Sequence, residues 1–209
     1  MKDIFWAGEN ANKKAKAKAS DVPIGAASDK NNIVETVNNR IYYYSEVSRQ
    51  KILDLNKSMR NLNDNLLNQA QLLGLQDPAS IHIHINSFGG SVFAGLSAVD
   101  YIKACEVPVI TVVEGCAASA ATLFSVVGEH RQIRSNSFML IHQISSGMWG
   151  KYEELKDSID NCDLFMRIIK DIYHEHTKIP KKKLNEILKH DLWFDAETCL
   201  EYGLVDEII

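Results

Sequence analysis

The sequence predicts an α/β domain built around a parallel sheet, and three observations support that prediction. Strand-like and helix-like patterns alternate along residues 81–141, as they do where parallel strands are joined by right-handed helical crossovers. Short motifs rich in glycine, serine or histidine follow the expected strands, at the edge where such sheets bind ligands. The 209-residue chain is also long enough to bury one substantial core.

Composition is that of an ordinary soluble protein. Hydrophobic residues make up 45% of the chain and the formal net charge is -4, so charge gives no support for nucleic-acid binding. No run approaches the roughly 20 apolar residues that a membrane helix needs, and the first residues lack the apolar core of a signal peptide. We therefore expect a cytoplasmic protein with neither a membrane nor a nucleic acid as partner.

The four cysteines are widely scattered along the chain. They form no CxxC pair and have no zinc-like spacing, which favours small buried thiols over metal ligands. Disulfides are not expected in a reducing compartment.

Residues 1–32 are polar, with lysines separated by alanines, and we expect a mobile extension ahead of a domain at 33–209. A solvated tail is favoured over a docking element. Within the domain, RIYYY (40–44) predicts a first strand, because it is rich in aromatic and β-branched residues. Apolar residues from Ile52 to Leu73 recur at steps of three, four or seven, which predicts a helix that ends near Gly74.

The next segment, IHIHI (81–85), alternates strictly, so its isoleucines face one side of a strand and His82 and His84 the other. Two histidines on one face invite a metal interpretation, but no third ligand is evident nearby, and structural histidines are favoured. Further along, the pattern predicts a helix, a strand, a helix and a strand in turn, at residues 91–105, 108–113, 119–127 and 137–141.

A long helix is predicted after the hinge-like glycines Gly147 and Gly150. Its apolar residues advance by four and three alternately: Leu155, Ile159, Cys162, Met166, Ile169 and Tyr173. This stripe is compatible with a core helix and at least as compatible with a protruding arm that packs on a symmetry mate. A short amphipathic helix follows in PKKKLNEILKH (180–190).

Three motifs supply the parts of a serine hydrolase: INSFGGSV (85–92), EGCAASAA (114–121) and MLIHQ (139–143). A serine hydroxyl is a poor nucleophile at neutral pH, so such an enzyme needs a base and donors for the oxyanion. Ser119 lies among small residues, and His142 can serve as the base. The glycines of the first motif can bring backbone N–H groups close to a substrate carbonyl. An extended peptide, bound by β-augmentation along a cleft strand, is the expected substrate.

Spacing does not settle which acid would orient His142, because triads are defined by geometry rather than by chain order. Asp191 lies in the aromatic segment HDLWFDA, and Asp195 and Asp206 are its rivals. Cys116, three residues before Ser119, could also be near the site. A catalytic role for this thiol is disfavoured, because the serine-based set is already complete.

Residues 40–209 resemble ClpP, the family of proteolytic subunits of the Clp protease, which are serine peptidases with a crotonase-like fold. The likeness rests on motifs in the family's order and at family-like separations: INSxGGSV (85–92), GxAAS (115–119), IHQ (141–143), Asp-x-aromatic (191–193) and EYGLVDEI (201–208). The family usually has proline where Phe88 stands. The resemblance implies a crotonase-like domain of repeated βα and ββα units, with a protruding handle helix at about 147–176.

The same resemblance implies roles for five residues. Ser119 would be the nucleophile, His142 the base and Asp191 the orienting acid. The backbone N–H groups of Gly90 and Ala120 would form the oxyanion hole.

Substrate contacts would fall to Gly89, Ser145 and Gly147, with no metal and no organic cofactor. Family members act on unfolded polypeptides as two stacked rings, a tetradecamer, fed by an ATP-dependent AAA+ unfoldase. ATP would be bound by that partner, because GGxxxxG (89–95) lacks the lysine of a phosphate loop. A propeptide in the first residues, removed by self-cleavage, is a further possibility that the family suggests.

Three other functions remain open. The crotonase-like fold also serves acyl-CoA hydratases and isomerases, which have a similar oxyanion hole but need no Ser-His-Asp triad. A non-catalytic ring scaffold is the second alternative. The unusual first forty residues suggest the third, a specialised viral prohead or processing protease. Labelling of Ser119 by a fluorophosphonate would separate a serine peptidase from the first. The second predicts intact assembly with no effect of Ser119→Ala on turnover.

Overall fold

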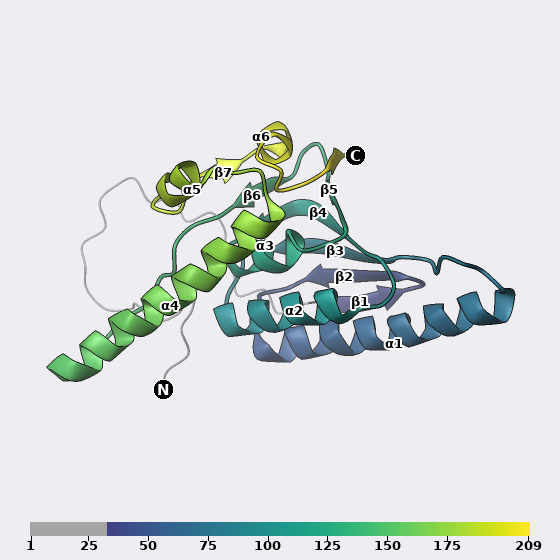
Figure 1. Ribbon diagram of the computed structural model, residues 1–209, viewed down its shortest axis with the longest axis horizontal. Helices are drawn as coiled ribbons and strands as arrows, with labels where there is room; N and C mark the ends of the chain where they lie inside the picture. Colours follow the sequence, from purple (N-terminus) through teal and green to yellow (C-terminus); the bar gives the residue numbers. More distant parts are fainter. Residues whose placement is uncertain (1–32) are drawn as a thin grey trace.

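The computed structural model describes residues 33–209, which form one branched sheet and the helices packed on it (Figure 1). The extension expected at 1–32 lies outside the described residues. The described strands and helices are β1 (Ile33–Val37), β2 (Arg40–Tyr44), α1 (Arg49–Leu73), β3 (Ile81–Ser87), α2 (Val92–Ala104), β4 (Val109–Ala118), α3 (Ala120–Ser125), β5 (His130–Ile133), β6 (Phe138–Leu140), α4 (Tyr152–His176), α5 (Lys181–Ile187), β7 (Trp193–Phe194), α6 (Ala196–Glu201) and β8 (Glu207–Ile208).

The sheet runs in the order β1-β2-β3-β4-β5-β8, and β6 and β7 branch from β4. Strands β2 to β5 are parallel, as expected from the alternation of elements, whereas β1 and β7 are antiparallel to their neighbours. The first half of β4 pairs with β5 and its last residues pair with β6. Gly115, with a φ of 77°, lies where β4 changes partner. The end of this long strand, just before Ser119, therefore lies between β3 and β6.

Helices α1 and α2 lie side by side along one face of the sheet (Figure 1). The isoleucines of β3 are fully buried in the core, together with apolar side chains of α1 such as Leu55 and Met59. Helix α1 begins after Ser48, whose hydroxyl accepts a hydrogen bond from Lys51 N, and ends at Gly74 in the left-handed conformation. Both ends follow ordinary capping rules, and the predicted end at Gly74 is confirmed.

Four strands were not predicted from the sequence: β1, β5, β7 and β8. Two of them contain only two residues, too few to show a period. The expected alternation of IHIHI is confirmed, since its isoleucines lie in the core while His84 stacks on Tyr42 of the neighbouring strand. His82 is half-buried and His84 is buried, so the histidine face is also largely covered. The strand expected at 108–113 is longer than predicted, because it continues through the small residues up to Ala118.

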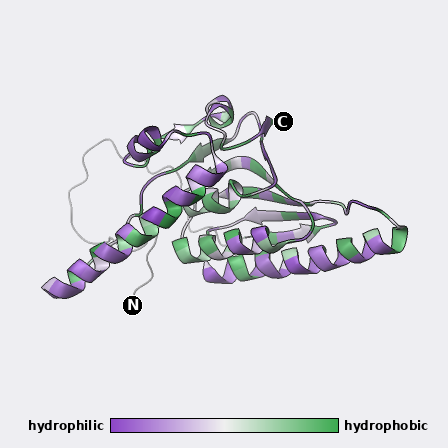
Figure 2. Ribbon diagram, viewed as in Figure 1, coloured by the Kyte–Doolittle hydropathy of each residue, from purple (hydrophilic) through white to green (hydrophobic). Residues whose placement is uncertain are grey.

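Helix α4 is both a core helix and an arm. Its C-terminal part buries Ile169, Ile172 and Tyr173, while Ile159 and Leu164, nearer its start, are exposed. Figure 1 shows this outer part extending beyond the sheet, and Figure 2 shows it as mostly hydrophilic with scattered hydrophobic residues. The helix begins at Tyr152, so the residues at 147–151 lead into the arm without belonging to it. No helix in the described range is long and apolar enough to cross a membrane.

Candidate active site

Ser119 lies between the last residue of β4 and the first of α3, in an unusual backbone conformation. Its φ is 58° and its ψ is -129°, a combination that costs a residue with a Cβ of the order of 1–3 kcal/mol. The Ser119 N–H donates to the carbonyl oxygen of Leu140 on β6, at 2.8 Å, which helps to hold the turn. Strain of this kind persists where the surrounding structure compensates for it, and it is common at functional sites.

His142 faces this serine and Asp191 faces the histidine. The distance from His142 Nε2 to Ser119 Oγ is 3.0 Å, and that from His142 Nδ1 to Asp191 Oδ1 is 2.9 Å. His142 follows β6, and Asp191 lies just before β7, which pairs antiparallel with β6 through Leu140 and Trp193. That pairing brings together two side chains that are distant in sequence.

The surroundings of His142 and Asp191 differ sharply. The histidine side chain is 9% exposed and the carboxylate 77%. Burial lowers the pKa of His142 below its ordinary value, and the neighbouring Asp191 carboxylate opposes that change without cancelling it. His142 is therefore neutral near pH 7, which is the state that a general base requires.

The two rival acids have other partners. Asp195 is the N-cap of α6 and accepts a hydrogen bond from Thr198 N at 2.9 Å. Asp206 pairs with the guanidinium of Arg131. Of the three acids named from sequence, only Asp191 forms an ion pair with His142.

Gly89 and Gly90 form a loop pressed against Ser119. Gly89 has a φ of 95°, and a Cβ on it would lie 2.6 Å from the Cβ of Ser119 and 2.7 Å from the Ala118 carbonyl oxygen. Gly90 has a φ of 143°. Only glycine, which has no Cβ, allows the backbone to come this close to its neighbours. The glycine pair in the sequence is therefore required for steric reasons.

Two backbone N–H groups remain available beside Ser119. Within residues 33–209, the Gly90 and Ala120 amides donate to none of the turn, loop or cap hydrogen bonds, although Gly89 and Ser91 are both tied to Val47. Ala120 is the first residue of α3, whose initial N–H groups have no partner inside the helix. These amides can therefore donate to an oxyanion bound between them.

Val47 is a residue of this site that sequence reasoning missed. It accepts a hydrogen bond from Ser91 N and donates one to the Gly89 carbonyl, both at 2.7 Å, and so holds the glycine loop from both sides. Its contribution comes from the backbone, so no side-chain signal in the sequence could have indicated it.

The segment that contains Ser145 and Gly147, both expected to contact the substrate, contains no strand. Residues 141–149 have no regular structure, and Ser145 and Gly147 are exposed. Gln143 N donates to the Leu188 carbonyl at 2.7 Å, and Ile144 N lies 3.3 Å from the sulfur of Met166 on α4. A Cβ added to Gly147 would meet no heavy atom within 4 Å, so there is open space beside this residue.

The surroundings of Cys116 and His84, which were also named from the sequence, favour structural roles for both. Burial raises the pKa of the Cys116 thiol to about 11, which keeps it protonated and a poor nucleophile. His84 is stacked on Tyr42, and its Nδ1 lies 3.0 Å from Glu114 Oε1. In the described part of the chain, no group of three or more metal-binding side chains is placed to share an ion.

Phe88 occupies the position where the resembled family usually has proline. It packs edge-on against Trp193, with ring centroids 6.4 Å apart. Phe88 directly precedes the glycine loop, and Trp193 lies two residues after Asp191. This contact connects the loop of the exposed Asp191 carboxylate to the glycine loop beside Ser119.

Comparison with known proteins identifies the family. The family model described as Clp protease matches residues 35–209. The chain belongs to the Clp protease family. Two curated members of it are similar over most of the chain. The ATP-dependent Clp protease proteolytic subunit of Deinococcus radiodurans is 31% identical over 170 residues, which is 79% of this chain and 83% of that protein. Proteolytic subunit 3 of Streptomyces coelicolor is 35% identical over 144 residues, 68% of this chain and 66% of that one.

A solved structure gives the same assignment. A point mutant of ClpP1 from Listeria monocytogenes has a TM-score of 0.70 at 25% sequence identity, over 82% of this chain and 91% of that one. The predicted crotonase-like α/β fold of the Clp protease family is thereby confirmed, and this chain is a Clp-type peptidase. Among the functions left open by sequence, the comparisons favour a peptidase over an acyl-CoA enzyme.

Proposed function

We propose that the chain cleaves peptide bonds through an acyl-enzyme on Ser119, with His142 as the base and Asp191 as the acid that orients it. The observation that carries the proposal is the continuous contact from Ser119 Oγ to His142 Nε2 at 3.0 Å and from His142 Nδ1 to Asp191 at 2.9 Å. A neutral histidine at this distance can take the hydroxyl proton as the serine attacks.

The first half of the reaction follows from these positions. Ser119 Oγ bonds to the carbonyl carbon of the substrate while its proton moves to His142 Nε2. The carbonyl oxygen becomes an oxyanion, to which the Gly90 and Ala120 amides donate. The C–N bond then breaks, His142 gives the proton to the departing amine, and an ester on Ser119 remains.

Water completes the second half. His142 takes a proton from the water as it attacks the ester, the same amides bind the new oxyanion, and the proton returns to Ser119 Oγ as the acid product leaves. Asp191 stabilises the imidazolium that forms in both halves. Its exposure weakens this interaction through solvent screening, so contacts that shield Asp191 in an assembly would strengthen it.

The substrate is proposed to be an extended, unfolded polypeptide. Ser145 and Gly147 lie in an exposed segment without regular structure, and the Gly89 loop lies against Ser119, so both can offer backbone hydrogen-bonding groups to a peptide. Such a peptide would be recognised by main-chain bonds. The relatives' names describe proteolytic subunits that are ATP-dependent. By that likeness we propose a homo-oligomer of two stacked rings supplied by an AAA+ unfoldase.

Intact-protein mass after incubation with a fluorophosphonate tests the nucleophile. Wild type should gain one adduct, Ser119→Ala none, and His142→Ala very little, because the base activates the serine. The two variants should lose turnover of a fluorogenic peptide to a similar extent, since triad members act as a unit. Equal labelling of wild type and Ser119→Ala would refute the assignment of Ser119.

A further inference from the structure

Two buried hydroxyls connect helix α4 to the peptide bond that follows Ser119. Thr122 on α3 donates its Oγ1 hydrogen to the Ser119 carbonyl oxygen at 2.6 Å, and its backbone N–H donates to the same oxygen at 3.0 Å. The Tyr173 hydroxyl on α4 lies 2.5 Å from Thr122 Oγ1. Because the Thr122 hydrogen is directed at the carbonyl, Tyr173 must be the donor in its bond to Thr122. One chain of hydrogen bonds therefore runs from Tyr173 through Thr122 to the Ser119 carbonyl.

This chain lies entirely inside the protein. Thr122 and Tyr173 are both 0% exposed, and a buried hydroxyl without a partner is unfavourable. Each hydroxyl supplies the partner that the other needs. Burial also raises the pKa of Tyr173 far above its ordinary value, with Thr122 opposing it, so the phenol keeps the proton that it donates.

The geometry of the peptide bond determines what this chain of hydrogen bonds does at the site. The unit from the Ser119 carbonyl to the Ala120 N–H is planar and trans, so the C=O and the N–H point in opposite directions. Hydrogen bonds that fix the carbonyl therefore fix the direction of the Ala120 N–H. The strained φ and ψ of Ser119 mean that this plane would relax if it were not held.

We propose that Thr122 and Tyr173 are positioning residues that hold the Ser119–Ala120 peptide and so aim the Ala120 N–H at the oxyanion. This inference rests on the proposed function, because Ala120 is an oxyanion donor only if Ser119 is the nucleophile. It also assigns to the buried end of α4 a part in supporting the site, distinct from any role of the exposed arm.

Thr122→Val removes the hydroxyl from a side chain of nearly the same shape. It should lower kcat about 10–100-fold, because an oxyanion donor acts in the transition state, and leave KM within about two-fold. A peptide aldehyde, which forms a tetrahedral adduct, should lose affinity by a factor similar to the loss in kcat/KM, whereas a product peptide should not. Thr122→Ser keeps a hydroxyl and should restore most of the lost rate.

Thr111→Val is the matched control. Thr111 is also fully buried, and its Oγ1 donates to the Ser125 carbonyl at the other end of α3, at 2.7 Å. The control loses a hydrogen bond of the same kind to the same helix, but not the one at Ser119. Its melting temperature should fall about as much as that of Thr122→Val, while its kcat should stay within about two-fold of wild type.

A double-mutant cycle tests the order of the chain. Tyr173→Phe should lower kcat roughly 3–10-fold, and adding it to Thr122→Val should produce no further loss, because Tyr173 acts through Thr122. Losses that multiply, a Thr111→Val variant as slow as Thr122→Val, or full kcat in Thr122→Val would each overturn the proposal. Failure of the proposed function would instead appear in wild type, as the absence of a Ser119 adduct.

Discussion

At the scale of single residues, several unfavourable local conformations and surroundings are gathered around Ser119. Ser119 adopts a conformation with a φ of 58°, Gly89 approaches it so closely that a Cβ has no room, and His142 is buried although the proposed mechanism has it accept a proton during turnover. Each departure from an ordinary local preference lies at the same place. Such clustering is expected where function, rather than stability, selects the residue.

The pH dependence of kcat/KM should show the burial of His142. An unperturbed histidine titrates near pH ~6.5, and burial lowers the pKa of His142 more than Asp191 raises it. Because the proposed base is active as the neutral imidazole, activity should rise with pH and reach half its plateau below that value. The measurement is kcat/KM of a fluorogenic peptide between about pH 5 and pH 8.

Asp191→Asn gives the control for the pH profile. Removing the carboxylate removes what raises the pKa of His142, so the midpoint should move further down while the plateau falls by about 10²–10⁴-fold. A midpoint that moves up, or an unchanged plateau, would contradict the role given to Asp191.

Gly89→Ala should abolish most activity. The added Cβ would lie 2.6 Å from the Cβ of Ser119, at a φ of 95°, so either the glycine loop or the serine must shift. A shift of about 1 Å in a catalytic group can cost on the order of 10²-fold in rate. Gly74→Ala is the matched control, because it carries the same kind of strain with no atom within 4 Å. It should lose about 1 kcal/mol of stability, as seen in thermal unfolding, and retain its kcat.

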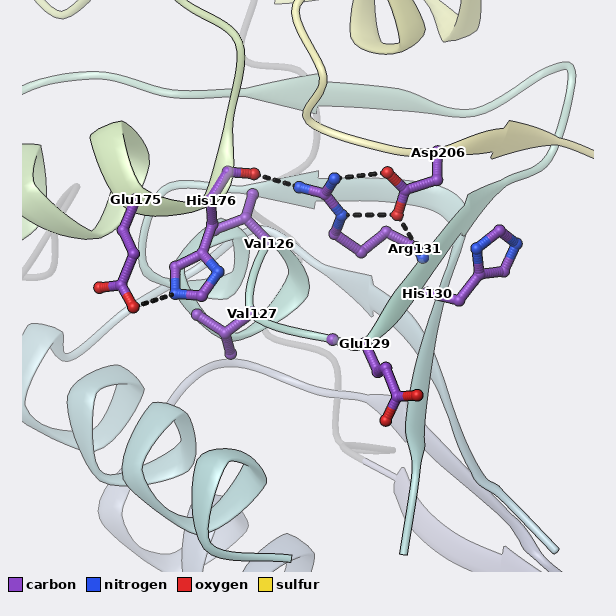
Figure 3. A pocket seen from close by; sticks show the side chains of 9 residues that line it. Val126, Val127, Glu129, His130, Arg131, Glu175, His176 and Asp206 are labelled. Carbon is purple, nitrogen blue, oxygen red and sulfur yellow. Dashed lines mark hydrogen bonds and ion pairs between the residues drawn. The ribbon is translucent and has the colours of Figure 1, made fainter. Parts of the chain in front are cut away.

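At the scale of elements, Arg131 fastens the C-terminal segment to the sheet. Its guanidinium donates to Asp206 at 2.8 and 2.5 Å, to the Gly203 carbonyl at 2.9 Å and to the His176 carbonyl at the end of α4. Arg131, His176 and Asp206 line a cavity of about 610 Å³ (Figure 3). One side chain on β5 thus holds the end of α4 and the approach to β8 together.

Asp206→Asn should destabilise the fold without affecting catalysis. The hydrogen bond from Arg131 lowers the pKa of Asp206, so the carboxylate contributes stability above pH ~4. That contribution is lost as the pH falls through the lowered pKa. Near pH 7 the loss should be about 1–2 kcal/mol, at the low end for charged hydrogen bonds because the carboxylate is partly exposed.

Thermal unfolding of Asp206→Asn and wild type at pH 7 and pH 3 would measure this difference. The gap in melting temperature should be about 2–8 °C at pH 7 and smaller at pH 3. Asp191→Asn should show the reverse pattern, with lost turnover and little change in stability. Lost turnover in Asp206→Asn at an unchanged melting temperature would make Asp206 the catalytic acid instead.

Sequence patterns predicted the elements that bury a continuous apolar face and missed those that do not. The alternating strand β3 and the periodic helices α1 and α4 were predicted from their spacing. Strands β7 and β8 have two residues each, and β5 (HRQI) is mostly polar, so none shows a period. Spacing alone left the choice among three acids open for the same reason, and only the family resemblance named Asp191. In the structure the antiparallel pairing of β7 with β6 brings Asp191 to His142.

At the scale of the whole molecule, the outer part of α4 exposes apolar side chains. Ile159 and Leu164 are exposed, although the helix itself continues into the core at Ile169. An arm of this length has no evident use in a single protomer. The proposed stacking of two rings would cover it, since each arm could pack on that of a symmetry mate.

Ile159→Asp should therefore shift the oligomer to a smaller species. The substitution puts a charge into an apolar contact between protomers, where an unpaired charge is strongly unfavourable. Removal of the whole helix would be a poorer test, because it would also take Tyr173 out of the core. Ile159 is 52% exposed in the protomer, so its replacement should barely change the stability of the isolated fold. Sedimentation velocity of the intact protein would report the change in size.

Asp157→Asn is the control for this measurement. Asp157 is exposed and lies two residues before Ile159, which places it roughly opposite on the helix at about 100° per residue. It should leave the assembly intact. A reduced size in Ile159→Asp with fluorophosphonate labelling of Ser119 retained would mean that the triad forms in the smaller species. A reduced size with labelling lost would mean that ring contacts order the exposed Asp191 loop. An unchanged size would place the contact between protomers elsewhere than on this face of α4.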